Sequence, residues 1–226
     1  MILSIESGTD ICSVGLSSKG DTFAIRESVV GRDHARDIAL FVDELLRDSG
    51  VDVCELEAVA VSHGPGSYTG LRIGVSFAKG LCYGLDIPLI GVGSLESLAV
   101  LALSQQPDMD ESTLLCPMID ARRMEVYMQM FDNELQPLTQ PEARVIDASS
   151  FDSYKEHGQR LLLFGDGAAK CAEVSGCEMI DVRASARGVG WLAYEKLQWG
   201  DVESVAYFEP FYLKEANITE SKRKYF

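Results

Sequence analysis

The sequence has few histidines, no closely spaced cysteine pair and little positive charge. Its three histidines, His34, His63 and His157, share neither HExxH nor HxxxH spacing, so a catalytic metal site is not expected. Six cysteines occur without CxxC spacing, mostly inside apolar segments: Cys12, Cys54, Cys82, Cys116, Cys171 and Cys177. This pattern indicates reduced, buried thiols and argues against a disulfide framework or a zinc site.

The shortage of basic residues limits contact with nucleic acid. The formal net charge is -15 and the sequence pI is about 4.6, whereas phosphate binding depends on Lys and Arg. If RNA is involved, a partner is expected to hold most of it. The basic run Lys222-Arg223-Lys224 is either a local exception or a solvated tail.

Long apolar runs and targeting segments are also missing. No stretch reaches the roughly 18 uninterrupted apolar residues of a membrane span. The sequence opens directly on a strand pattern, without the basic start and apolar run of a signal peptide. We therefore expect a cytoplasmic protein with no membrane contact.

Two catalytic loop motifs are absent as well. There is no GxxxxGK[ST] loop. The segment from Gly64 to Tyr68 fails the GxSxG pattern, because the residue two after Ser67 is Thr69.

The most informative segment that is present runs from His63 to Gly74, with sequence HGPGSYTGLRIG. It joins an apolar strand pattern at 58–61 to an apolar helix pattern that extends to Leu85. A helix start after a glycine turn can bind an anion through its free N–H groups. Equally, the small residues Gly70, Gly74 and Ala78 can let another helix approach closely. These residues leave both interpretations open.

The remaining pattern alternates strands with helices in two similar halves, an α/β arrangement. A helix capped by Asp33 should run to Ser49 and end at Gly50, and Ser94 should cap a helix to about Ser104. The polar segment 105–110 is the best linker, which predicts domains at 1–106 and 107–226. Strands are predicted at 2–6, 13–17, 22–29, 58–61, 88–92, 114–119, 125–131, 144–146 and 161–164, and a final helix at 189–198.

Acidic residues at strand ends suggest only limited chemistry. Glu6 ends the first strand, where a nucleotide-binding acid could help to hold Mg²⁺. Asp120 and Glu125 flank Arg122-Arg123 and form either a polar cluster or a surface hairpin.

Together with ILSIE at the start, DARRMEVY at 120–127 and PFYL at 210–213, the glycine segment resembles the bacterial TsaB (YeaZ) family. The resemblance implies an actin/hexokinase/Hsp70-like (ASKHA) fold with two similar lobes, each a mixed sheet with packed helices. It implies a non-catalytic scaffold, without cofactor or metal, in the formation of threonylcarbamoyladenosine beside the tRNA anticodon. The implied partners are a TsaD-like catalytic subunit, which contacts tRNA, and a TsaE-like ATPase.

By this resemblance, the helices of the first lobe bind the catalytic subunit, and the isolated chain forms a homodimer. Ser94 and Leu98 stand where the catalytic relative has its two metal-binding histidines. Replacement of Gly74 by Leu is expected to separate the subunits. The implied interface residues are Ala35, Ile38, Phe41, Val42, Leu45, Gly66, Ser67, Tyr68, Thr69, Gly70, Arg72, Ile73, Gly74, Phe77 and Leu81.

A vestigial nucleotide site is also implied, and the extreme C-terminus can pack back onto the first lobe. Two positions depart from the family pattern, since Glu6 replaces the more usual Asp and Gly8 stands where Ser or Thr is common. Two alternatives remain: a metalloprotease, from the glycoprotease-like label of the relatives, and an autonomous ATPase. The residues of the nucleotide site are Glu6, Gly64, Gly165, Asp166 and Gly167.

Overall fold

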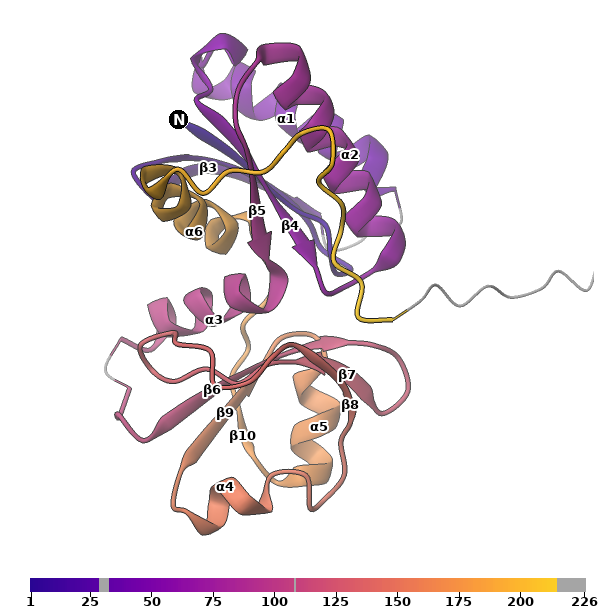
Figure 1. Ribbon diagram of the computed structural model, residues 1–226, viewed down its shortest axis with the longest axis vertical. Helices are drawn as coiled ribbons and strands as arrows, with labels where there is room; N and C mark the ends of the chain where they lie inside the picture. Colours follow the sequence, from indigo (N-terminus) through magenta and orange to yellow (C-terminus); the bar gives the residue numbers. More distant parts are fainter. Residues whose placement is uncertain (29–32, 108, 215–226) are drawn as a thin grey trace, which may run out of the picture.

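The computed structural model describes residues 1–28, 33–107 and 109–214, and contains two five-stranded sheets (Figure 1). The end of the predicted strand at Val29 and the basic run at 222–224 lie outside the described residues. None of the helices in the described part of the chain is both long and apolar enough to cross a membrane.

The first sheet has the order β3-β2-β1-β4-β5. β1 pairs antiparallel with β2 and parallel with β4, and alternate residues of β1 face opposite layers. Leu3 and Ile5 pack under α1 and α2, whereas Ile2 packs under α6. The elements are β1 (Ile2–Glu6), β2 (Cys12–Ser18), β3 (Asp21–Ser28), α1 (His34–Ser49), the 3-10 helix η1 (Val53–Glu55), β4 (Ala58–Gly64), α2 (Tyr68–Leu85) and β5 (Leu89–Gly93).

The second sheet repeats this plan, with the order β10-β9-β6-β7-β8. Its first three strands are antiparallel, and β9 and β10 add in parallel beside β6, as β4 and β5 do beside β1. The expected pair of similar lobes, each with a mixed sheet, is therefore confirmed. The elements are β6 (Thr113–Asp120), β7 (Glu125–Met128), β8 (Glu142–Val145), α4 (Asp152–Glu156), β9 (Arg160–Phe164), α5 (Ala168–Ser175) and β10 (Glu178–Met179).

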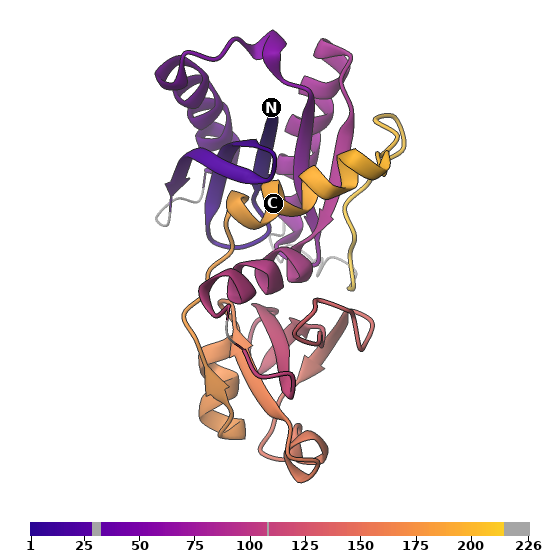
Figure 2. The ribbon, with the colours of Figure 1, turned by 90° about the vertical axis from the view of Figure 1, so that its left-hand side faces the viewer.

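Helix α3 (Ser94–Gln105) lies between the two lobes, as both ribbon views show (Figures 1 and 2). Leu95 and Leu98 pack with Leu115 and Phe164 of the second sheet. Val100 packs with residues of the first sheet and α6. Because α3 is buried on both sides, it has an apolar surface nearly all round.

The C-terminal part of the chain returns to the first lobe. Helix α6 (Ala186–Trp199) covers the face of the first sheet opposite α1 and α2 (Figure 1). Residues 203–213 then pass along β5 and α2, with Lys79 Nζ donating to the carbonyl of Phe208 over 2.8 Å. The first lobe therefore includes chain from both sides of residue 106. The division into domains at 1–106 and 107–226 remains a prediction.

Several predicted element ends differ from the structure. Gly93, not Ser94, is the N-cap of α3, and the Ser94 side chain is buried. β7 ends at Met128, since Phe131 instead forms bridges with Leu115 and Pro137. The predicted end of α1 is confirmed, because Gly50 is left-handed at φ 65° and its N–H bonds back to the helix.

Candidate functional site

The glycine turn before α2 packs directly against the turn that follows β1. The Ser67 N–H donates to the carbonyl of Gly8 over 2.7 Å, and the Ser67 hydroxyl accepts from the Gly70 N–H at 3.3 Å. A Cβ on Gly66 would lie 2.3 Å from the Gly8 oxygen. The glycines therefore allow the β1–β2 turn to pack closely against the N-terminus of α2. This turn occupies the position from which an anion would approach the helix.

Gly70 and Gly74 serve the same internal contact. A Cβ on Gly70 would lie 2.0 Å from the Ser7 carbonyl oxygen, and one on Gly74 would lie 2.2 Å from the Ser7 hydroxyl. That hydroxyl donates to the Gly70 carbonyl over 3.0 Å. The expectation that these two glycines face a partner is therefore wrong, and Gly74→Leu would disturb the fold itself.

Three apolar residues of α1 are likewise used by the core. Ile38, Val42 and Leu45 are at most 6% exposed and pack on the first sheet. The resemblance implies that they face a partner, whereas the structure buries them against the first sheet of the same chain. An apolar stripe predicts that a helix face is covered, and does not say whether the same chain covers it.

The other proposed interface residues are accessible. Ala35, Ser67, Tyr68, Thr69 and Arg72 are exposed, and Phe41, Gly66, Ile73, Phe77 and Leu81 are half-buried. The Tyr68 ring lies 4.6 Å from the Tyr212 ring of the C-terminal segment, centroid to centroid, and the guanidinium carbon of Arg72 lies over the Tyr68 ring, 5.1 Å from its centroid.

The outward surface of the two helices, here called the α1–α2 face, contains two glycines with open space beside them. Among the described residues, no side chain or distant backbone lies within 4 Å of a Cβ built on Gly80 or Gly84. Sequence spacing places Gly80 and Gly84 at a different angle around the helix from Gly70 and Gly74, and the implied interface contains only the latter two. Exposed residues of the face include Ala35, Ala39, Leu40, Thr69, Arg72, Ser76, Gly80, Tyr83 and Gly84.

The residues predicted to form a vestigial nucleotide site are only partly brought together. Glu6 and Asp166 come from different lobes, and Asp166 is close enough to raise the pKa of Glu6. Gly165 and Gly167 pack on β6, where a Cβ on Gly165 would lie 2.3 Å from the Met118 oxygen. Gly64 packs against the carbonyl of Phe211 and the Leu71 side chain.

Glu6 is fully buried, and desolvation raises its pKa to about 7. The Gly8 N–H, 2.6 Å from Oε1, opposes this increase, whereas Oε2 has no hydrogen-bond partner among the described residues. A carboxyl group that is half protonated near neutral pH is a weak Mg²⁺ ligand. The autonomous ATPase alternative remains a prediction.

Asp120 ends β6 in the position that Glu6 has at the end of β1. Lys170 Nζ bonds its carboxylate over 2.7 Å, and Arg122 and Arg123 form the turn of the β6–β7 hairpin with positive φ angles. Lys214 Nζ pairs with Glu125, so the structure contains both the hairpin and a polar cluster around it.

Comparison with known proteins identifies the family. The tRNA threonylcarbamoyladenosine biosynthesis protein TsaB of Bacillus subtilis is 33% identical over 166 residues, which cover 73% of this chain and 70% of that protein. The chain belongs to the TsaB (YeaZ) family. A family model described as "TsaD: tRNA N6-adenosine threonylcarbamoyltransferase" also matches residues 25–185.

Other members of the TsaB (YeaZ) family agree over different lengths. TsaB of Haemophilus influenzae is 34% identical over 133 residues, covering 59% of this chain and 54% of that protein. The chain thus spans about half the length of that relative. YeaZ from Pseudomonas aeruginosa has a TM-score of 0.80 at 25% identity, over 94% of this chain and 99% of that chain.

A more distant likeness concerns the fold alone. A polyphosphate/ATP-glucomannokinase from Arthrobacter has a TM-score of 0.50 at 14% identity, over 87% of this chain and 98% of that chain. This agrees with the ASKHA architecture expected for the TsaB (YeaZ) family.

Proposed function

We propose that this chain takes part in threonylcarbamoyladenosine formation on tRNA as a non-catalytic scaffold. It binds a TsaD-like catalytic subunit through the α1–α2 face, in a complex that also includes a TsaE-like ATPase. Two observations support this pathway: the TsaB relatives are named for it, and the matching family model is that of the transferase.

The observation that carries the proposal is the open pair Gly80 and Gly84. Glycine inside an exposed helix costs about 0.5–1 kcal/mol relative to alanine, and in the described part of the chain no atom occupies the space that a Cβ on either residue would fill. They leave the backbone of α2 accessible to close approach by a partner helix. Tyr83, 85% exposed between them, supplies the kind of large aromatic side chain that anchors protein interfaces.

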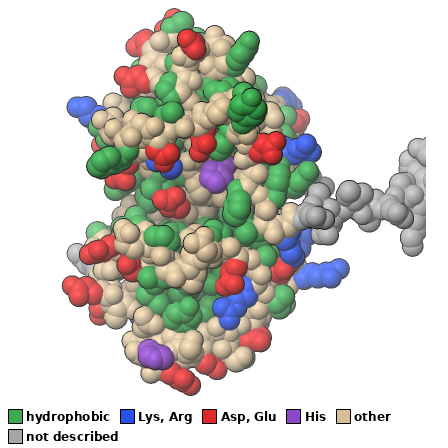
Figure 3. Space-filling view, in the orientation of Figure 1, with side chains coloured by type: hydrophobic (Ala, Val, Ile, Leu, Met, Phe, Trp, Pro, Cys, Tyr) green, Lys and Arg blue, Asp and Glu red, His purple; other side chains and the backbone are tan. Residues whose placement is uncertain are grey.

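The acidic charge of the chain supports a complex in which the partner, rather than this chain, holds the tRNA. The chain has a formal net charge of -15, and acidic side chains are spread over both lobes on the side that Figure 3 shows. Phosphate contacts depend on basic residues, so tRNA is held mainly by the partner. In isolation, the α1–α2 face can pair with a second copy around a two-fold axis.

The test is Gly80→Leu, which adds bulk without filling occupied space. Leucine favours a helix, so the variant should fold normally while its association with the TsaD-like subunit weakens by about tenfold or more, or about 1.4 kcal/mol. Association is measured by calorimetry, and tRNA modification by reconstitution with the TsaD-like and TsaE-like partners.

Ala169→Leu is the matched control, because Ala169 is an exposed position of α5 on the second lobe. It should bind and support modification like the wild type. Wild-type association of Gly80→Leu would contradict the assignment of this face. Full modification in the absence of the chain would contradict the scaffold role.

A further inference from the structure

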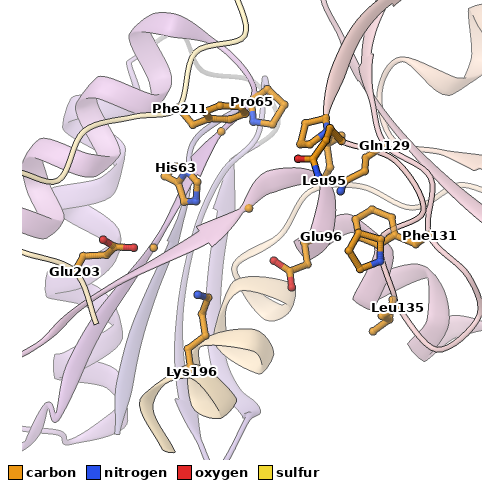
Figure 4. A pocket seen from close by; sticks show the side chains of 16 residues that line it. His63, Pro65, Leu95, Glu96, Gln129, Phe131, Leu135, Lys196, Glu203 and Phe211 are labelled. Carbon is orange, nitrogen blue, oxygen red and sulfur yellow. The ribbon is translucent and has the colours of Figure 1, made fainter. Parts of the chain in front are cut away.

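Acidic residues outnumber basic residues in this chain, and the cleft between its lobes follows the same balance. The cleft has a volume of about 400 Å³ and is lined by Glu96 and Glu203 among other residues (Figure 4). Lys196 is the one lysine or arginine among its described lining residues, and it forms an ion pair with Asp201. The cleft is therefore a poor place for a phosphate group.

The turn of the β6–β7 hairpin is a local exception to this balance. Arg122 and Arg123 form the turn, and both are exposed. Their φ angles are 75° and 55°, a left-handed backbone in which Asn or Gly is usual and a long side chain is disfavoured. Because such strain collects at functional positions, two arginines here point to a use for their charge.

The backbone of this turn is fixed by Lys170 of α5. Its Nζ donates to the carbonyl oxygens of Arg123 and Glu125 over 2.7 and 2.9 Å, and to Asp120 Oδ1 over 2.7 Å. The same Oδ1 accepts from the Arg122 N–H over 2.6 Å. The two arginine side chains thus start from an ordered backbone, which lowers the entropy cost of binding through them.

The acidic side chains around the turn are already engaged. Asp120 forms an ion pair with Lys170, and Glu125 forms one with Lys214. Asp166 Oδ1 accepts from the Asp120 N–H over 2.9 Å, and burial raises the pKa of Asp166, which disfavours its charge. Within the described residues, neither arginine of the turn forms an ion pair or a side-chain hydrogen bond, so both charges remain available to a ligand.

The hairpin lies near the start of α2, at one end of the α1–α2 face. Lys214 of the C-terminal segment pairs with Glu125 of the hairpin. Two residues earlier, the Tyr212 ring lies 4.6 Å from the ring of Tyr68 in the first turn of α2, centroid to centroid. On the side that Figure 3 shows, basic side chains gather beside the grey residues. A ligand held by a partner on the α1–α2 face would therefore be close to this turn.

We infer that Arg122 and Arg123 bind the phosphate backbone of an RNA. Each guanidinium group presents its N–H donors in a planar fork that matches two oxygens of one phosphate, and two neighbouring forks suit successive phosphates of one strand. The inference rests on the proposed function for the identity of the RNA, which is the tRNA held mainly by the TsaD-like partner. The turn adds a second, smaller contact with it.

The experiment measures binding of labelled tRNA to the full chain in complex with its TsaD-like and TsaE-like partners, by fluorescence anisotropy. The double variant Arg122→Gln, Arg123→Gln should bind tRNA about tenfold more weakly at about 50 mM salt. Between about 50 and 200 mM salt, the wild-type complex should lose about tenfold more affinity than the variant complex, because each phosphate contact adds to the salt dependence. A purely structural role for the arginines would not change this salt dependence.

The matched control is the double variant Arg183→Gln, Arg187→Gln, which removes the same charge from two exposed arginines at the start of α6. It should bind tRNA like the wild type. The variant Arg122→Lys, Arg123→Lys keeps the charge and should keep most of the salt dependence. If the glutamine double variant does not fold, Arg122→Gln alone takes its place, with about half the change in salt dependence.

The inference is overturned if the glutamine variant binds tRNA like the wild type, with the same salt dependence. It is also overturned if the variant loses association with either protein partner, because the turn would then be a protein contact. Failure of the proposed function is a different result, in which the wild-type chain does not bind the TsaD-like subunit. The isolated chain, titrated with tRNA at low salt, then decides the inference: the wild type should bind severalfold more tightly than the glutamine variant, and equal binding would overturn it.

Discussion

At the scale of the residue, Glu6 is the most unusual group in the chain. It is fully buried at the end of β1, accepts a hydrogen bond from its own turn, and has one oxygen without a partner among the described residues. Desolvation dominates, so its pKa rises from 4.5 to about 7. Folding therefore favours the protonated form of this carboxyl group.

This raised pKa predicts how stability changes with pH. Between pH 4.5 and about 7 the native state keeps the proton that the unfolded chain releases, so the contribution of Glu6 to stability declines as pH rises. Above that window, ionised Glu6 costs on the order of 3 kcal/mol. Glu6→Gln should match the wild type near pH 4.5 and be more stable by a similar amount at pH 8.

Urea unfolding at the two pH values measures this difference. The exposed Glu173 of α5 provides the control, because Glu173→Gln should have the same stability difference from the wild type at both pH values. A Glu6→Gln variant with the same pH dependence as the wild type would contradict the buried carboxyl assignment.

At the scale of the element, α2 uses glycine in two opposite ways. Its first turns need Gly70 and Gly74 because the Ser7 backbone and side chain occupy the space of a Cβ. Its last turns expose Gly80 and Gly84 to open space. One helix thus serves the fold at one end and remains available to a partner at the other.

A pair of alanine substitutions separates these roles. Gly80→Ala should stabilise the isolated chain by about 0.5–1 kcal/mol, because alanine is the better helix former. Gly70→Ala should destabilise it by about 1–3 kcal/mol or more, since the Cβ meets backbone that cannot move freely. Urea unfolding gives both values. Changes of the same sign would contradict the division of α2 into an inward and an outward half.

At the scale of the whole molecule, the two lobes are joined by the crossing of α3 and α6. A Cβ on Gly188 of α6 would lie 2.4 Å from the Ser97 carbonyl oxygen of α3. Helix α3 also covers the second sheet. The contact between α3 and α6 therefore helps to hold the first lobe against the second lobe.

Gly188→Ala should therefore destabilise the molecule by about 1–3 kcal/mol, because two packed helices must separate. Gln198→Ala, at an exposed position of the same helix, should remain within about 0.5 kcal/mol of the wild type. Thermal and urea unfolding of both variants measure the effect. Equal stability of the two would show that the crossing is loosely packed.

Much of the local structure could be predicted, because strand and helix periods and cap residues act over a few positions. The start of α1 at Asp33 and the left-handed Gly50 and Gly200 follow from such local rules. The prediction of Ser94 as the N-cap of α3 is wrong, because the Ser94 side chain is buried near Gly8 of the first lobe and Gly93 is the cap.

The candidate site could be predicted less well. Tyr68, Thr69 and Arg72 are exposed, so their place in a partner interface stays a prediction. Ile38 and Gly74 are buried within the chain, because an apolar stripe or a small residue indicates only that something lies close by. Local patterns also give no sign that Glu96, Glu203 and Lys196 line one cleft, since they come from three separate segments of the chain.

By itself, the sequence determined the alternation of strands and helices, the two-lobed α/β architecture and the family, because these depend on local periodicity and on contiguous motifs. Only the tertiary structure decided which glycines of α2 face inward and which carboxylates share a cleft. The physical reason is that burial is a property of the assembled layers: the space beside a residue is occupied, or left open, by chain that lies far from it in sequence.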